Sequence, residues 1–123
     1  VKALKVETGI GIKPQAVMTL SVHGEDRNVT MGGGGPVDAV FRAIREAYPH
    51  TATLQLFQIN AVTEGTDAQA TVSVRLEENG RTVTGKASDT DTMVAAAYAY
   101  VNALNKLLVK REKQAPEALT VAR

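Results

Sequence analysis

The sequence predicts an α+β domain made of two β-β-β-α units that are related by internal pseudo-twofold symmetry. The first observation is an internal repeat, in which TLSVHGEDRNVT at residues 19–30 resembles TVSVRLEENGRTVT at residues 71–84. The second is that each copy is followed by a short stretch of small residues and then by a helical pattern. Strands that lead twice into a helix are typical of a duplicated supersecondary unit.

Length and composition indicate one domain with an aliphatic core. The chain has 123 residues, of which 44% are hydrophobic but only 4% are aromatic, and tryptophan is absent. A chain of this length can bury a modest core, which valine, leucine, isoleucine and alanine must fill. No apolar run reaches the ~18 residues that a membrane-spanning helix needs, so no membrane association is expected.

The charges and the missing cysteine exclude further classes of function. The formal net charge is +1 and the basic and acidic residues are interspersed, so no electrostatic footprint for nucleic acid is visible. Cysteine is absent, which removes disulfides and thiolate chemistry and agrees with a reducing cytoplasm. We therefore expect a cytoplasmic protein that does not bind nucleic acid.

Each unit is expected to begin with three strands. The candidates for the first strand of each unit are VKALKVETG at residues 1–9 and LQLFQINAV at residues 54–62. In the next strand of each unit apolar residues alternate with polar ones, which predicts one buried face; they are Met18, Leu20 and Val22, and then Val72, Val74 and Leu76. ENGR at residues 78–81 predicts a tight hairpin, because Asn and Gly tolerate positive φ.

Each unit is expected to end with a helix. The pattern PVDAVFRAIREA begins at Pro36, which suits the first turn of a helix because its missing N–H costs nothing there. The second pattern covers residues 91–108, and its apolar stripe, flanked by alanines that permit close approach, consists of Val94, Ala97, Val101, Leu104 and Leu108. Asp89 and Asp91 precede this helix and are interpreted as N-capping residues.

The stretch MGGGGPVDAVFRAI at residues 31–44 needs its own explanation, because four glycines lead directly into the first helix. A Walker phosphate loop needs Lys-Ser or Lys-Thr where this chain has Pro36 and Val37. A dinucleotide fingerprint needs a parallel strand and a crossover, whereas an antiparallel hairpin is predicted here. Two interpretations remain. Either the open amides of the helix start bind a small anion such as a carboxylate, or the glycines only allow a turn and Asp38 is a capping carboxylate.

No catalytic or metal-binding group emerges from the remaining polar residues. His23 and His50 have no partners at metal or triad spacing, so each is interpreted as a solvated loop residue. Tyr98 and Tyr100 lie on different faces of the second helix, so one is expected in the core or an interface and the other exposed. We expect a chain without catalytic residues, without a bound metal and without a cofactor.

Three stretches in the same order carry a resemblance to a known family: GGGGPVDAVFRAI, INAVTEGTDAQATVSVRL and GKASDTDTMVAAAYAYVNALNKL. Over residues 15–110 the chain resembles the C-terminal regulatory domain of 2-isopropylmalate synthase, and citramalate synthase carries a similar domain. The resemblance implies a homodimeric domain of two β-β-β-α units that binds leucine or isoleucine as the end product of its pathway. It also implies inhibition of a catalytic barrel of the same polypeptide, which condenses acetyl-CoA with a 2-oxo acid using a divalent metal and lies outside this chain.

The resemblance implies an effector site whose residues follow from the matching positions. Its polar end would consist of Gly33, Gly35, Val37 and Asp38, and the effector's side chain would be surrounded by Leu54, Phe57, Ala61, Ala68 and Thr92. Two positions depart from the family pattern, because Phe57 stands where Tyr is frequent and Gly34 where Asn is frequent. Strict alternation breaks at Leu56–Phe57, so a bulge is expected there that turns Phe57 into the pocket.

Three functions stay open at this point. The chain is a leucine sensor of a 2-isopropylmalate synthase, an isoleucine sensor of a citramalate synthase, or a dimerisation module whose effector site has decayed. An apolar pocket separates leucine from isoleucine by only ~1–3 kcal/mol, because one methyl group moves. We expect residues 1–14 to be a strand that joins a missing catalytic part, residues 15–110 to form the regulatory amino-acid-binding domain, and residues 111–123 to be a frayed tail.

Overall fold

The computed structural model describes the backbone of residues 1–62 and 68–120, and the side chains of residues 1–60 and 68–108. Within these ranges the chain forms two consecutive units of three strands and a helix, as the sequence predicts. The first unit consists of β1 (Ala3–Gly9), β2 (Ile12–Val22), β3 (Glu25–Gly32) and α1 (Pro36–Ala47). The second consists of β4 (Thr53–Val62), β5 (Ala70–Glu78), β6 (Arg81–Asp89) and α2 (Thr92–Thr120).

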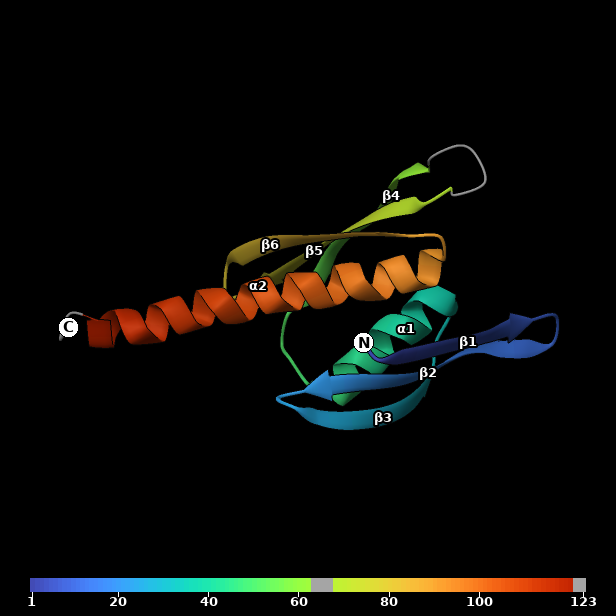
Figure 1. Ribbon diagram of the computed structural model, residues 1–123, viewed down its shortest axis with the longest axis horizontal. Coiled ribbons are helices and arrows are strands. Elements are labelled where there is room, and N and C mark those ends of the chain that lie inside the picture. The colour runs from blue at the N-terminus through green and yellow to red at the C-terminus, as the bar shows by residue number, and fades with distance from the viewer. Residues whose placement is uncertain (63–67, 121–123) are drawn as a thin grey trace.

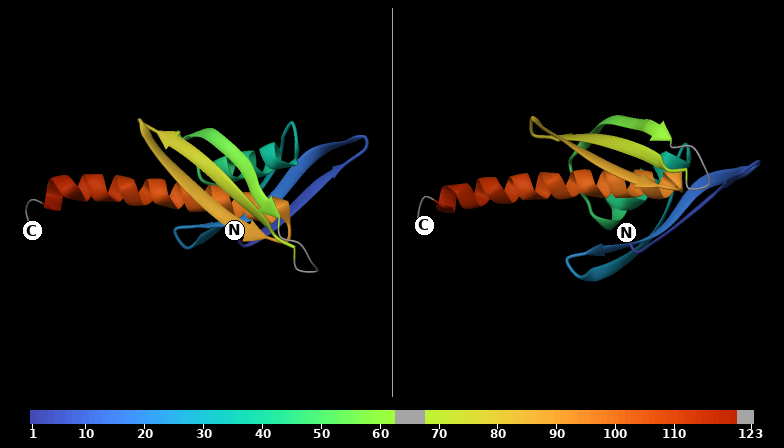
Figure 2. Two further views of the ribbon diagram at one scale, coloured as in Figure 1. Left: turned by 90° about the horizontal axis from the view of Figure 1, so that it is seen from above. Right: turned by 45° about the horizontal axis from the view of Figure 1, so that its top comes forward.

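Each unit folds its strands into a separate antiparallel sheet, in the order β1-β2-β3 and β4-β5-β6. Figure 1 shows both helices between the two sheets, and the turned views of Figure 2 show the same arrangement. Helix α1 packs on β2 and β3, α2 packs on β5 and β6, and the helices contact each other. The α+β fold of two β-β-β-α units is therefore confirmed.

One core joins the two units. The largest fully buried side chains come from both halves of the chain: Met18, Val40, Ile44, Val72, Val74 and Leu76. Four of these six lie in the alternating strands, at positions where the sequence predicts a buried face, and the other two belong to the first helical pattern. The packing therefore ties the sheets to a shared layer of helices, and neither unit has a core of its own.

The two hairpins of the repeat have the same backbone conformation. His23 and Gly24 join β2 to β3 with φ of 52° and 80°, and Asn79 and Gly80 join β5 to β6 with φ of 52° and 80°. Positive φ at both central residues is the signature of a type I′ turn, whose twist matches that of the flanking strands. The predicted hairpin at ENGR is confirmed, and the equivalent turn at His23 shows that the repeat extends to backbone detail.

Helix α2 lies directly against the backbone of β6. An added Cβ at Gly85 would meet the carbonyl oxygen of Ala99 and the amide nitrogen of Ala103, so no other residue fits between strand and helix. Ala99 and Ala103 are themselves fully buried. The expectation that alanines permit close approach is confirmed. Gly85 is the residue on β6 that allows the strand to approach these alanines.

The N-terminus of α2 is capped by the side chain of Asp91, the residue directly before the helix. Asp91 Oδ1 accepts hydrogen bonds from the amides of Met93 at 2.8 Å and Val94 at 3.3 Å, and Asp89 Oδ1 accepts one from the amide of Asp91 at 2.9 Å. Because a carboxylate here satisfies amides that the helix leaves open, the predicted N-capping is confirmed. Helix α2 continues to Thr120 and projects beyond the sheets (Figures 1 and 2), so it passes through part of the segment predicted as a tail.

Candidate ligand-binding site

The four glycines at residues 32–35, here called the glycine turn, lead from β3 into α1, and they have different roles. Gly33 donates its amide to the carbonyl oxygen of Pro14 at 3.2 Å, and a Cβ on Gly33 would lie 2.5 Å from the amide nitrogen of Ala39. Gly33 is thus required for the chain to pass close to the helix. Gly35 has an extended backbone with φ of −160°, and a Cβ there would meet no atom within 4 Å. The fold therefore does not require glycine at position 35.

The side chain of Asp38, in the first turn of α1, forms hydrogen bonds with the glycine turn and with the next turn of the helix. Its Oδ2 accepts hydrogen bonds from the amide of Gly34 at 2.8 Å and from Nε of Arg42 at 2.9 Å. Asp38 is therefore a capping carboxylate, as one of the two interpretations holds. The amides of Gly35, Val37 and Asp38 have no acceptor among the described residues, so the other interpretation, an anion at the helix start, stays a prediction.

A trough of about 380 Å³ runs along the exposed side of α1, between the edges of the two sheets. Its wall is apolar, with Met31 from β3, Phe41 from α1, Leu54 from β4 and Tyr100 from α2, and its rim is charged, with Asp38, Arg42, Arg45 and Glu46 from α1. The trough thus brings together two residues of the predicted effector site, Asp38 and Leu54. Phe57 lies beside it, because its ring packs edge-on against Phe41 with the centroids 5.7 Å apart.

The apolar wall extends along the inner face of β4. Leu54 pairs with Leu76 and Ile59 pairs with Val72, and residues opposite each other in a ladder share a face. Their partners are fully buried, whereas Leu54 is 45% and Ile59 48% exposed, because α2 packs on β5 and β6. The predicted bulge occurs in this strand, but it lies between Leu54 and Leu56, one residue earlier than expected, and a second lies between Ile59 and Ala61.

The other predicted site residues do not line the trough in the described part of the chain. Thr92 begins α2, and Ala68 precedes β5. The starts of the two helices are close together, because Pro36 and Asp91 line one cavity of about 270 Å³ with residues of β1. Ala61 lies in β4, but its side chain is outside the described residues.

Tyr100 forms the floor of the trough and connects it to the loop before β4. The centroid of its ring lies 4.6 Å from the ring centroid of Phe41, and its hydroxyl oxygen lies 3.0 Å from Nε2 of His50. Burial raises the pKa of Tyr100, and the positive charge of Arg45 offsets part of this increase, so the phenol is neutral at ordinary pH. The interpretation of His50 as a solvated loop residue is therefore wrong, whereas His23 is exposed as predicted.

The tyrosines of α2 divide as expected, with Tyr100 3% and Tyr98 40% exposed. The residues that sequence reasoning missed in the trough are Met31, Phe41, Arg42, Arg45, Glu46 and Tyr100. The signal for Arg42 was its position four residues after Asp38, since side chains at this spacing are neighbours on a helix. No local signal joins Phe41 to Tyr100, because the two come from different units.

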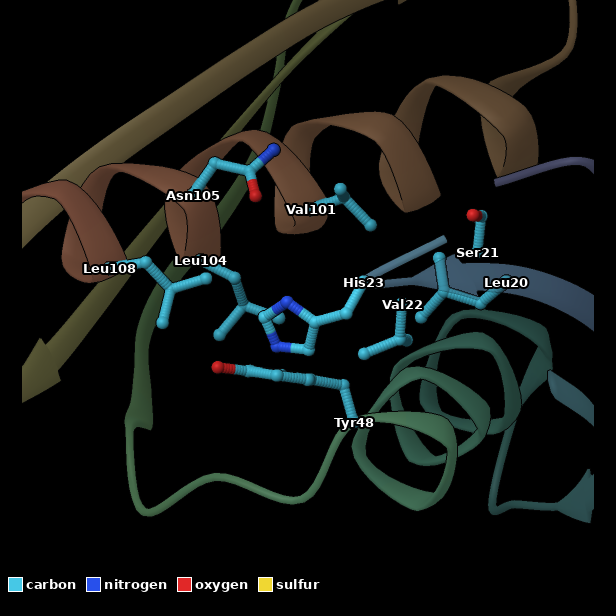
Figure 3. Close-up of a pocket in the computed structure, with 9 residues that line it drawn as sticks. All are labelled: Leu20, Ser21, Val22, His23, Tyr48, Val101, Leu104, Asn105 and Leu108. Carbon is cyan, nitrogen blue, oxygen red and sulfur yellow. The ribbon is translucent and has the colours of Figure 1, made fainter. Parts of the chain in front are cut away.

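A cavity of about 210 Å³, smaller than the trough, lies at the C-terminal end of α1. Figure 3 shows Val101, Leu104 and Leu108 of α2 on one side of this cavity, His23 from the turn after β2 below them, and the ring of Tyr48 on the far side of His23. These three leucine and valine side chains belong to the predicted apolar stripe of α2. The stripe thus faces the first sheet, while Ala99 and Ala103 face β6.

The described part of the chain contains neither a membrane-spanning helix nor a cluster of metal ligands. Across residues 1–62 and 68–120, no helix combines the length and apolar character needed to cross a membrane. Among the described side chains, those of residues 1–60 and 68–108, no group of three or more His, Cys, Asp or Glu is placed to hold a metal ion.

The fold defines a duplicated α+β domain, and a trough with an apolar wall and a charged rim is suited to a small ligand that has both characters. The chain belongs to the LeuA allosteric (dimerisation) domain family, whose model matches residues 1–108.

Several curated relatives share one name. The chain is 62% identical over 103 residues to a 2-isopropylmalate synthase of Caulobacter sp. (strain K31), which covers 84% of this chain and 20% of the relative. It is 51% identical over 114 residues to that of Rhodopseudomonas palustris (strain BisB18), and 50% identical over 116 residues to that of Nitrobacter winogradskyi. These two matches cover 93% and 94% of this chain and 22% of each relative. The chain thus spans about a fifth of the length of these relatives.

Proposed function

We propose that this chain is the regulatory domain of a 2-isopropylmalate synthase, and that it binds leucine as a feedback inhibitor in the trough beside α1. The family match and the relatives' name support the parent enzyme. The observation that carries the site is that Asp38, Leu54 and Phe57, which are far apart in sequence, meet at one trough. Its apolar wall suits a branched side chain, and the open amides at Gly35 and Val37 suit a carboxylate.

The test is calorimetry of the 123-residue chain with leucine, isoleucine and valine. Leucine is expected to bind more tightly than the other two, and in the parent enzyme the same ligand should lower the activity. Tighter binding of isoleucine would instead favour the regulatory domain of a citramalate synthase. Heat with none of the three would overturn the proposal and leave a dimerisation module.

We further propose that the domain forms a homodimer through the open side that contains the trough. Strand β4 is the edge of its sheet, and its exposed Leu54 and Ile59 extend an apolar surface beside α1. The neighbouring face of α1 carries Arg42 and Arg45 as well as Asp38 and Glu46, and a surface with both signs of charge can pair with its own copy about a twofold axis.

Replacing Ile59 with Glu is expected to weaken the dimer by at least ~10-fold, because a charge would be buried at the interface. Sedimentation equilibrium of the variant and the parent measures this change. Ile10→Glu is the matched control, since Ile10 is an exposed isoleucine in the turn between β1 and β2. A parent chain that is monomeric at micromolar concentration would contradict the dimer, and equal effects of both variants would place the interface elsewhere.

A further inference from the structure

We propose that Arg42 is a binding residue of the trough that the family resemblance did not indicate. Arg42 binds the carboxylate of a free α-amino acid together with the open amides at Gly35 and Val37, while Asp38 faces the ammonium group of the amino acid. The pair thereby distinguishes the amino acid from the 2-oxo acid with the same side chain. This inference rests on the proposed function, because it concerns the ligand of the same trough.

The position of the Arg42 guanidinium follows from its hydrogen bond to Asp38. Nε of Arg42 lies 2.9 Å from Oδ2 of Asp38, and this same oxygen lies 2.8 Å from the amide of Gly34. The guanidinium is therefore held back along the helix, over the first turn of α1 and next to the glycine turn. Its two terminal nitrogens make no hydrogen bond to a described residue, so they can form a two-pronged contact with a carboxylate.

The other arginine of the trough, Arg45, already forms a hydrogen bond with the backbone. Nη2 of Arg45 donates to the carbonyl oxygen of Ala52 at 2.9 Å, which fixes Arg45 to the loop before β4. Arg27, on the neighbouring strand β3, likewise donates to the carbonyl oxygen of Ala47 at 2.7 Å. Among the described residues on this side of the domain, Arg42 is thus the arginine that lines the trough and whose terminal nitrogens have no carbonyl partner.

An ordinary surface ion pair is the competing explanation. Pairs at this helical spacing are common and contribute little to stability, and the side chains of Arg42 and Asp38 are 60% and 47% exposed. The location separates the two explanations, because both groups stand on the rim of a trough whose wall is Met31, Phe41 and Leu54. A ligand that fills this wall with its side chain would place its charged end at the rim.

The paired charges select for a zwitterion. A free amino acid offers an ammonium to the carboxylate of Asp38 and a carboxylate to the terminal nitrogens of Arg42, so it adds one charged contact to each member of the pair. A 2-oxo acid lacks the ammonium, and it would put its carboxylate near Asp38 without compensation. An amino alcohol lacks the carboxylate and leaves Arg42 unused.

The experiment measures binding of three probes to the 123-residue chain by calorimetry: leucine, 4-methyl-2-oxopentanoate and leucinol. For Arg42→Gln we expect leucine to bind roughly 10- to 100-fold more weakly, since a charged hydrogen bond is lost, and leucinol to bind as in the parent. For Asp38→Asn we expect the preference for leucine over the 2-oxo acid to shrink. Lys2→Gln is the matched control, because Lys2 pairs with Asp26 at similar exposure outside the trough, and it should change nothing.

Four outcomes would overturn the inference. If leucine binds the Arg42→Gln variant as tightly as the parent, Arg42 is a surface residue and the proposed function stands without it. If the variant loses leucine and leucinol equally, the substitution acts on the shape of the trough. If the parent binds the 2-oxo acid as well as leucine, the pair does not select for the ammonium. If the parent does not bind leucine at all, the proposed function fails and the inference fails with it.

Discussion

Replacing Gly85 with Val is expected to lower the free energy of unfolding by roughly 3 kcal/mol or more, which is at the upper end for overpacking. A Cβ on Gly85 would collide with the backbone of α2 at Ala99 and Ala103, and it would lie 2.9 Å from the Cα of Ala103. Backbone atoms of a helix cannot rotate away as a side chain can, so the whole helix would have to move off the sheet. Both helices share one core, and displacement of α2 would therefore open the packing of both units.

Urea unfolding followed by circular dichroism measures this loss. The matched control is Lys86→Val, because Lys86 is the next residue of β6 and its side chain is exposed. The control should unfold within about 0.5 kcal/mol of the parent. A Gly85→Val variant that unfolds at the urea concentration of the parent would show that α2 does not rest on β6 at this point.

The second prediction concerns ligand binding and leaves the fold intact. Gly35→Val is expected to abolish leucine binding in calorimetry, with a thermal unfolding temperature close to that of the parent. The backbone of Gly35 is extended and a Cβ there meets no atom within 4 Å, so valine fits without strain. Its side chain would stand at the start of α1, over the open amides that the proposed function assigns to the effector's carboxylate.

Gly33→Ala provides the opposite case within the same turn. Its Cβ would lie 2.5 Å from the amide nitrogen of Ala39 and 2.8 Å from Oδ2 of Asp38, so this variant should lose stability. Comparing the two variants separates damage to the ligand site from damage to the fold. If Gly35→Val folds normally and binds leucine as the parent does, the glycines serve only as a turn.

Local signals predicted the strands and turns of this domain because their causes are local. Asn79 and Gly80 adopt positive φ as their residue types suggest, and Asp91 caps α2 through the amides that follow it. The repeat then predicted the architecture, since each copy of the hairpin leads into a helix. These features depend on neighbours within a few residues, and the sequence displays such neighbours directly.

Features that depend on tertiary contacts were predicted less well. Gly85 carries no sign of its role, because a glycine within a strand has the same appearance whether or not a helix rests on it. His50 sits in a loop by sequence, yet the fold brings it to the hydroxyl of Tyr100. The bulge in β4 was expected from broken alternation, but its position depends on pairing with β5 and moved to the residue before Leu56.

Some residues of the trough could be predicted from the sequence, and others could not. Resemblance to a family indicated Asp38, Leu54 and Phe57, and the structure brings these three to one place. Phe41 and Tyr100 complete the wall from two units, and no pattern in either unit predicts their contact. Thr92 and Ala68, which the resemblance also indicated, do not line the trough, and their role in binding stays a prediction.

The two helix starts of the repeat are no longer equivalent. Asp91, directly before α2, accepts hydrogen bonds from two amides of the first turn, whereas the residue before α1 is Gly35, which has no side chain, and Asp38 accepts from the preceding amide of Gly34 instead. A gene duplication yields two identical halves, and either half is then free to diverge while the other keeps its task. In the second half, the carboxylate of Asp91 already occupies the position that an anion would take at the helix start. The proposed function places the effector at the first helix start alone, so each copy of the polypeptide would bind one molecule.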